Sequence, residues 1–178
     1  CEDGVFAFIH PETVFNDLNA YLIREKLYPR LRKHFRFSNA LKLFAGVHSS
    51  REFGLNVFSN AVTNRFENIF NLYVPNTIDE SYEDAYPEAL LAMRNDDGDR
   101  ELRGNKSRII SIGEPELKLL ANVVDDSKKW ECARLLVMQL SQYMDILKIL
   151  NAQSNTIGML GDKVYASMMW DETNAQKN

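Results

Sequence analysis

The residues best suited to chemistry form a basic run in the first quarter of the chain. Six cations lie within thirteen positions, with a single acid, Glu25, among them; these cations are Arg24, Lys26, Arg30, Arg32, Lys33 and Arg36. The aromatic residues Tyr28, Phe35 and Phe37 are interleaved with the cations or follow them. Clustered cations contact phosphates, and aromatic rings stack on unpaired bases. The run therefore predicts a site for nucleic acid or another polyanion.

We expect the basic run to be helical, with Leu31 and Phe35 turned inward. Its predicted binding residues are Arg24, Lys26, Arg30, Arg32, Lys33, Arg36, Tyr28 and Phe37. Another interpretation remains open. Residues 79–101 carry nine acids against two arginines, and the run could neutralise this segment within the fold or across a subunit contact, or form a solvated face.

Motifs for catalysis and cofactors are missing from the sequence. It has no P-loop, no dinucleotide-binding glycine pattern, and no HExxH, CxxC or GxSxG. His10, His34 and His48 do not stand at metal-ligand spacing from one another or from a cysteine. Ser49 and Ser50 follow His48, but a nucleophile needs its base placed in space rather than in sequence. We expect no catalytic residue, no metal and no cofactor.

Two further stretches match metal sites only in part. Residues 114–118 contain an acid-x-Lys element of the kind that metal-dependent nucleases use, but Pro115 and the following periodicity predict a helix, whereas those enzymes use a strand. In residues 95–106, Gly98 can be aligned with the invariant glycine of a calcium-binding loop. This alignment places Gly104 at the position that needs a bidentate acid, so the calcium pattern fails. In both stretches, the charged residues are therefore better interpreted as solvated surface residues than as metal ligands.

Composition points to one globular domain with an ordinary core. The 178 residues are 45% apolar and 26% charged, and they include ten Phe, seven Tyr and two Trp. A net charge of −4 excludes a globally basic coat protein but allows a local basic patch. Two cysteines, Cys1 and Cys132, are too few for a disulfide framework. With no signal peptide pattern and no membrane span, we expect an intracellular, reducing compartment.

The stretch 128–150 is the most apolar and the most periodic part of the chain. Its apolar residues recur at spacings of three and four, the period of a helix face: Trp130, Ala133, Val137, Leu140, Met144 and Leu147. A second stripe, Leu136, Tyr143 and Leu150, lies beside the first. An apolar surface this wide predicts a helix that is buried on several sides. We therefore expect a central helix here.

The same periodicity predicts most of the remaining chain to be helical. Helices are expected over residues 11–26, 27–37, 38–46, 50–74, 87–93, 115–124 and 157–170, and a short strand over 108–112. Residues 5–9 could form a second short strand or a packed arm. The prediction is a mostly α fold, an irregular bundle of six or seven helices around the helix at 128–150. Residues 1–178 form one helical domain with an exposed acidic loop at about 95–106.

Function is predicted from this fold and from the lack of convergent polar residues. We expect a non-enzymatic helical protein-interaction module or structural subunit of a larger assembly, with a protein partner or self-association. Met159, Met168, Met169 and Trp170 are the candidate contact residues because methionine surfaces adapt to partners, although they suit a core equally well. The alternative is a domain that binds single-stranded RNA or DNA through residues 24–37.

Overall fold

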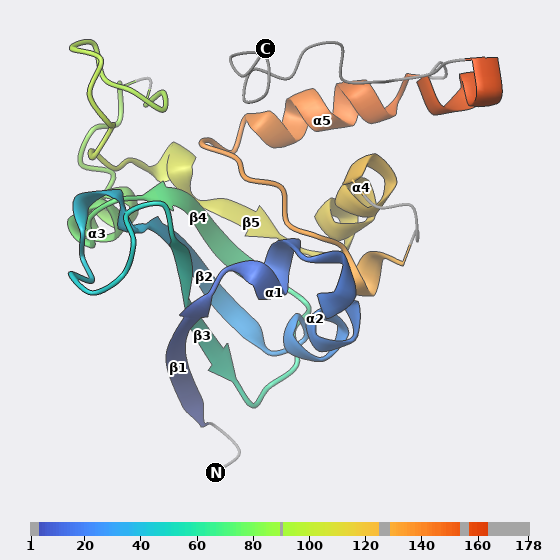
Figure 1. The fold of residues 1–178 in the computed structure, drawn as a ribbon, viewed down its shortest axis with the longest axis horizontal. Coiled ribbons are helices and arrows are strands. Elements are labelled where there is room, and N and C mark those ends of the chain that lie inside the picture. The colour runs from blue at the N-terminus through green and yellow to red at the C-terminus, as the bar shows by residue number, and fades with distance from the viewer. Residues whose placement is uncertain (1–3, 90, 125–128, 154–156, 164–178) are drawn as a thin grey trace, which may run out of the picture.

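A mixed five-stranded sheet forms the centre of the computed structural model, which describes residues 4–89, 91–124, 129–153 and 157–163 (Figure 1). The order in the sheet is β1-β3-β2-β4-β5. The strands are β1 (Val5–Pro11), β2 (Leu31–Ser38), β3 (Glu52–Ser59), β4 (Phe66–Leu72) and β5 (Ile110–Ile112). β2 and β4 are parallel, and the other neighbouring pairs are antiparallel.

Helices in the described residues are short. The α-helices are α1 (Thr13–Asn16), α2 (Tyr21–Leu27), α3 (Asn76–Glu83), α4 (Glu114–Val124) and α5 (Tyr143–Asn151). Single 3-10 turns cover Leu18–Ala20, Asn39–Leu41, Lys106–Arg108 and Trp130–Cys132, and a longer 3-10 segment with a kink at Gly161 covers Ile157–Lys163. None of the helices in this part of the chain is long and apolar enough to cross a membrane.

Apart from β1, whose side chains are mostly exposed, the sheet is covered on both faces. One face packs on α1, α4 and α5, through residues such as Phe15, Leu120 and Met144, and this side holds the larger core. A smaller core on the other face packs Phe35 and Ile69 against α3 and the chain around it. The strands therefore carry apolar residues on both faces, as sheets buried between two layers do.

The predicted mostly α bundle of six or seven helices is wrong, because the fold is α/β. Residues 27–37 and 50–74, both predicted as helices, contain β2, β3 and β4. In β4, Phe66 and Phe70 face the larger core while Ile69 faces the smaller one. Apolar residues at positions 66, 69 and 70 fit the spacing of a helix face and also fit a strand buried on both faces. Hydrophobic periodicity alone does not separate the two cases.

The predicted central helix at 128–150 is also wrong. In the described residues of this stretch, only Tyr143–Asn151 is α-helix. The segment before it crosses the larger core without regular structure and bonds to other parts of the chain: Leu135 N–H donates to Phe15 O (3.0 Å) and Ser141 N–H donates to Ser107 O (2.7 Å). Ala133 and Leu140 of the predicted apolar face are buried, but Val137 is exposed. The backbone of the segment bonds to distant parts of the chain, whereas the backbone of a helix bonds within the helix.

Other predicted elements had mixed outcomes. The helix at 115–124 is confirmed as α4, and the strand predicted at 108–112 is present as β5. Residues 5–9, for which a strand or a packed arm was open, belong to β1 at the opposite edge of the sheet. The helix at 11–26 is interrupted at Asp17, which has an extended backbone and accepts a hydrogen bond from Asn19 N–H. Residues 38–46 contain only a 3-10 turn, and residues 87–89 and 91–93 are not helical.

Candidate functional site

β1 is an edge strand with one free side. Within the described residues, its only strand neighbour is β3. Asn60 N–H donates to Gly4 O (3.1 Å), and Glu12 N–H donates to Glu52 O (3.4 Å). Bonded pairs recur at every second residue of an antiparallel ladder, so the even-numbered residues of β1 bond to β3. The N–H and C=O groups of its odd-numbered residues, which include Ala7, consequently point away from the sheet.

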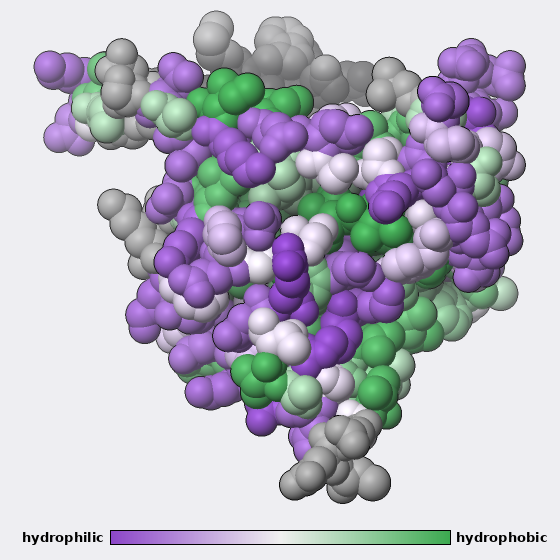
Figure 2. Space-filling model, turned by 180° about the vertical axis from the view of Figure 1, so that it is seen from behind, coloured by the Kyte–Doolittle hydropathy of each residue, from purple (hydrophilic) through white to green (hydrophobic). Residues whose placement is uncertain are grey.

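The side chains of β1 are apolar and exposed on both of its faces. The exposed fractions are 69% for Val5, 50% for Phe6, 40% for Phe8 and 53% for Ile9. Figure 2 shows apolar residues gathered along the side of the molecule that adjoins the N-terminal atoms, where β1 lies. Phe6 and Phe8 both stack on Phe58 of β3, with centroid distances of 5.3 and 5.1 Å. An uncharged free edge of this kind readily accepts another strand.

A pocket of about 450 Å³ opens beside the end of β1. Its lining residues are Ile9, His10, Pro11, Phe44, Val47, Arg51, Glu52 and Phe53. Phe44 and Phe53 meet edge to face with ring centroids 4.9 Å apart. Most of the wall is apolar, and the charged groups are Arg51 and Glu52, both exposed. A pocket with aromatic walls and few polar groups suits a flat apolar ring or an apolar side chain.

The buried side chain of Asn39 holds the loop that forms this pocket. Its Nδ2 donates to Phe44 O (3.0 Å) and Val47 O (2.8 Å), and its Oδ1 accepts from Phe44 N–H (2.9 Å). One amide side chain thus satisfies three backbone groups of the loop. The position of the Phe44 ring is therefore set from within the fold.

A row of polar side chains lies behind the pocket, on the face of the sheet that holds the larger core. His34 Nε2 lies 3.0 Å from Glu12 Oε1, and both side chains are almost fully buried. Asn56 Nδ2 donates to His10 Nε2 (3.1 Å), while His10 Nδ1 donates to Pro11 O (2.8 Å). Hydrogen bonds join these side chains in pairs, while the buried atoms His34 Nδ1 and Asn56 Oδ1 have no hydrogen-bond partner among the described residues. No group of three or more metal-ligating side chains occurs among the described residues.

The basic run does not form one surface, because β2 points its residues to alternate faces. Arg24 is 1% exposed and donates to the carbonyls of Cys132, Val14 and Asp17. Tyr28 and Phe37 are buried, and Tyr28 Oη donates to Ala133 O (2.5 Å). These three side chains belong to the core and are not accessible to a nucleic acid.

The other cations of the run are scattered. Arg36 is buried and pairs with Glu52, and Arg32 donates to Thr63 Oγ1 (2.9 Å) and to nearby carbonyls. Lys26 and Arg30 are exposed on and after α2. The ion pairs that join the run to acids in the described chain lead to Glu67 and Glu52, outside the acidic segment 79–101.

Lys33 belongs to a small polar group on the α3 side of the sheet. Lys33 Nζ donates to Glu67 Oε2 (2.8 Å) and to Tyr82 Oη (2.7 Å), and Tyr82 Oη donates to the same carboxylate (2.6 Å). Partial burial opposes ionisation of Glu67, but the two hydrogen bonds outweigh it and lower its pKa. Burial, followed by the hydrogen bond to Glu67 and the Glu67 charge, raises the pKa of Tyr82. This lysine is thus engaged within the fold.

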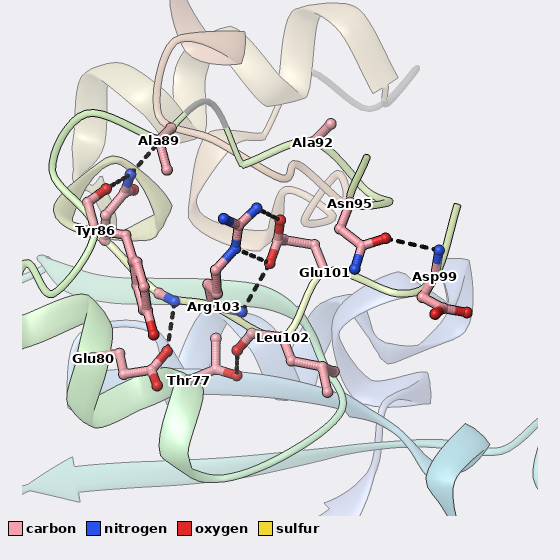
Figure 3. A network of polar contacts seen from close by, with 12 residues as sticks. Thr77, Glu80, Tyr86, Ala89, Ala92, Asn95, Asp99, Glu101, Leu102 and Arg103 are labelled. Carbon is pink, nitrogen blue, oxygen red and sulfur yellow. Dashed lines mark hydrogen bonds and ion pairs between the residues drawn. The ribbon is translucent and has the colours of Figure 1, made fainter. Parts of the chain in front are cut away.

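The predicted loop at 95–106 is exposed over residues 96–100 and anchored at its far end (Figure 3). Arg103 Nε and Nη2 donate to Glu101 (2.9 and 2.6 Å), and these bonds lower the pKa of Glu101 despite its burial. Gly104 N–H donates to Glu80 Oε2 of α3 (2.9 Å). Arg108, buried, donates to the carbonyls of Phe70, Asn71 and Arg103, and burial lowers its pKa to about 10. We assign these residues to loop anchoring.

Of the four predicted contact residues, only Met159 lies within the described residues. Met159 is 70% exposed, while Met168, Met169 and Trp170 lie outside the described residues. The sequence analysis did not identify β1, Phe44 or Phe53 as site residues. The signal for β1 was present as five consecutive apolar residues without a charge.

Comparison with known proteins gives little further information. No protein family model matches the chain, and no curated protein matches it. Among solved structures, a chain from "Structural basis underlying complex assembly and conformational transition of the type I R-M system" is similar, with a TM-score of 0.44 and 11% identity. The alignment covers 84% of this chain and 32% of that chain. At this TM-score and identity the similarity supports no conclusion about function.

Proposed function

We propose that this chain is a protein-interaction module or structural subunit of a larger assembly, which it joins through the free edge of β1. The observation that carries the proposal is an edge strand with the composition of an interior one. Residues 5–9 are all apolar, a pattern typical of strands that are covered on both faces and paired on both sides. In this chain the same residues are exposed.

The two edges of the sheet differ in how they are protected. Edge strands are usually kept short or carry charges, proline or bulges that discourage further pairing. β5 at the opposite edge has three residues, whereas β1 has seven and no charged side chain. Its one proline, Pro11, is its last residue. The length and composition of β1 thus favour pairing with another strand.

An added strand would gain from both backbone and side chains. Main-chain bonds to the outward groups of β1 provide affinity, and pockets beside the edge provide specificity, as in other complexes formed by strand addition. Full burial of a large apolar side chain contributes about 1.5–3 kcal/mol. The aromatic pocket that Ile9 shares with Phe44 can hold one side chain of the partner.

Strand addition can be measured with a synthetic peptide of alternating valine and isoleucine flanked by lysines. We expect it to bind the wild-type chain and the Ala7→Val variant similarly, and the Ala7→Pro variant about tenfold more weakly, because proline removes an outward N–H. The Ala7 N–H does not bond to β3, so both variants keep the fold, which circular dichroism would verify. Equal binding by all three folded proteins, or no binding by a chain that is monomeric at the assay concentration, would contradict the proposal.

Nucleic-acid binding is the second candidate function, and the pocket favours it. Phe44 and Phe53 provide ring faces and edges for an unpaired base, and Arg51 at the rim is an exposed cation for its phosphate. This site differs from the predicted basic run, of which Lys26 and Arg30 are the exposed members.

Fluorescence anisotropy of a labelled single-stranded RNA across a salt series separates these sites. If a base stacks in the pocket, Phe44→Ala is expected to weaken binding about 5- to 150-fold, and Arg51→Gln to reduce the salt slope by about 1. Val62→Ala, at an exposed residue of the β3–β4 turn, is the matched control. An effect confined to Lys26→Ala and Arg30→Ala would return the site to the basic run, and no binding at low salt would exclude both sites.

A further inference from the structure

We infer that the strand which pairs with β1 is β1 of a second copy of this chain, antiparallel and related by a two-fold axis at Ala7. The inference rests on the proposed function and names its partner. It joins two five-stranded sheets into one continuous sheet across the interface. Interfaces between two identical copies are isologous, so the edge must complement itself.

The outward backbone groups of β1 are self-complementary. They belong to Val5, Ala7 and Ile9, three residues placed symmetrically about Ala7. In an antiparallel pair centred on Ala7, each Ala7 faces its own copy and each Val5 faces Ile9 of the second copy. At all three positions the two facing residues then form a hydrogen-bonded pair, in which the N–H of each residue donates to the C=O of the other. Pro11, the next outward residue, has no N–H and ends the ladder.

The side chains match in the same register. Phe6 stands opposite Phe8 of the second copy at a non-bonded position, where side chains approach most closely. Both rings already stack on Phe58, so each copy extends the aromatic stack of the other. On the opposite face, Val5 meets Ile9. Residues 5–9 have no charge, so no like charges face each other across the axis.

This register also explains why both faces of β1 are apolar. Adding a strand to the edge of β1 leaves both faces of β1 exposed unless the side chains of the added strand cover them. The aromatic pairs cover the 50% and 40% exposed rings of Phe6 and Phe8 on one face. The pairs of Val5 with Ile9 cover the 69% and 53% exposed side chains on the other.

Disulfide trapping tests the register directly. In a Cys1→Ser background, mild oxidation of the Ala7→Cys variant is expected to give a covalent dimer, because residues in a bonded pair have Cα atoms about 5.5 Å apart, within disulfide range. Val5→Cys alone and Ile9→Cys alone should form no covalent dimer, since identical residues are then offset by four positions, about 13 Å along the strand. Mixing these two variants should restore a cross-linked dimer. Cross-linking of Val5→Cys with itself would overturn the register.

Sedimentation over a concentration series tests the dimer without cysteines. The wild-type chain and Ala7→Val are expected to dimerise with similar dissociation constants, whereas Ala7→Pro is expected to dissociate at least about tenfold more readily. A chain that stays monomeric at every concentration, without cross-linking, overturns the second copy as partner. If such a chain still binds the valine and isoleucine peptide, the proposed function stands with a different partner. If it binds neither, both proposals fail.

Discussion

Replacing Arg24 by methionine is expected to lower the free energy of unfolding by about 3–5 kcal/mol, because three carbonyls lose a charged donor. Arg24 is 1% exposed, and its Nε donates to Cys132 O (2.8 Å). Its Nη1 donates to Val14 O (2.9 Å) and Asp17 O (2.6 Å). One guanidinium therefore ties α2 to α1 and the residue that follows it, and to the 3-10 turn at Trp130–Cys132. Methionine keeps much of the volume but none of the donors.

Urea unfolding of the two proteins measures this loss. Arg30→Met is the matched control, since Arg30 is an exposed cation of the same basic run, and its substitution should change stability by less than about 0.5 kcal/mol. Similar midpoints for both variants would show that Arg24 does not hold the core. A change in RNA affinity without a change in stability would return Arg24 to the nucleic-acid site.

Replacing Gly104 by alanine is expected to cost about 2–3 kcal/mol, because a Cβ has no room there. An added Cβ would overlap Thr77 O and lie 2.6 Å from Ser81 Oγ and 2.7 Å from Ser81 N. Two of these three atoms are backbone of α3, which cannot turn aside as a long side chain can. The loop that follows residue 100 would therefore separate from α3 (Figure 3).

Gly46→Ala is the matched control for this substitution. A Cβ at Gly46 meets nothing within 4 Å, so the change should be close to neutral. Thermal unfolding of both variants, with amide exchange at residues 101–105, reports the stability and the attachment of the loop. Wild-type stability in the Gly104 variant would contradict the close contact with α3.

The sequence predicted burial better than it predicted structure. In the stretch 128–150, predicted as a buried helix, Ala133, Leu140, Met144 and Leu147 are buried and Trp130 and Leu136 are partly buried, whereas Val137, Tyr143 and Leu150 are exposed. Its helical conformation was wrong because backbone partners such as Phe15 O come from distant parts of the chain, which periodicity does not report. Hydrogen bonds to distant parts of the chain, rather than local helix propensity, determined the backbone conformation of this segment.

The strands show a second limit of periodicity. Apolar residues at 58, 62, 66, 69 and 70 fit a helix, yet Val62 lies in the exposed turn between β3 and β4. The strands around it are buried on both faces, so their apolar residues do not alternate cleanly. In contrast, the strand predicted at 108–112 from its β propensity is present as β5, whereas for residues 5–9 the sequence did not decide between a strand and a packed arm.

The candidate site was outside the reach of sequence patterns. The cations of the basic run share a stretch of sequence, but α2 and β2 send Arg24 and Arg36 into the interior and leave Arg30 outside. The pocket joins Ile9 of β1 with Phe44 and Phe53, which lie far from it in sequence. They are brought together by the pairing of β1 with β3, and the local sequence pattern of either strand does not predict that pairing.

Residue-resolved amide hydrogen exchange on β1 is the most direct test of its role as a docking edge. In the free monomer at low concentration, the Val5, Ala7 and Ile9 amides should exchange quickly, and the Phe6 and Phe8 amides, bonded to β3, should exchange slowly. A bound strand, from a second copy at high concentration or from the valine and isoleucine peptide, should slow the first three selectively. If those three amides are already protected in the monomer, or stay unprotected under both conditions, β1 is not the docking edge.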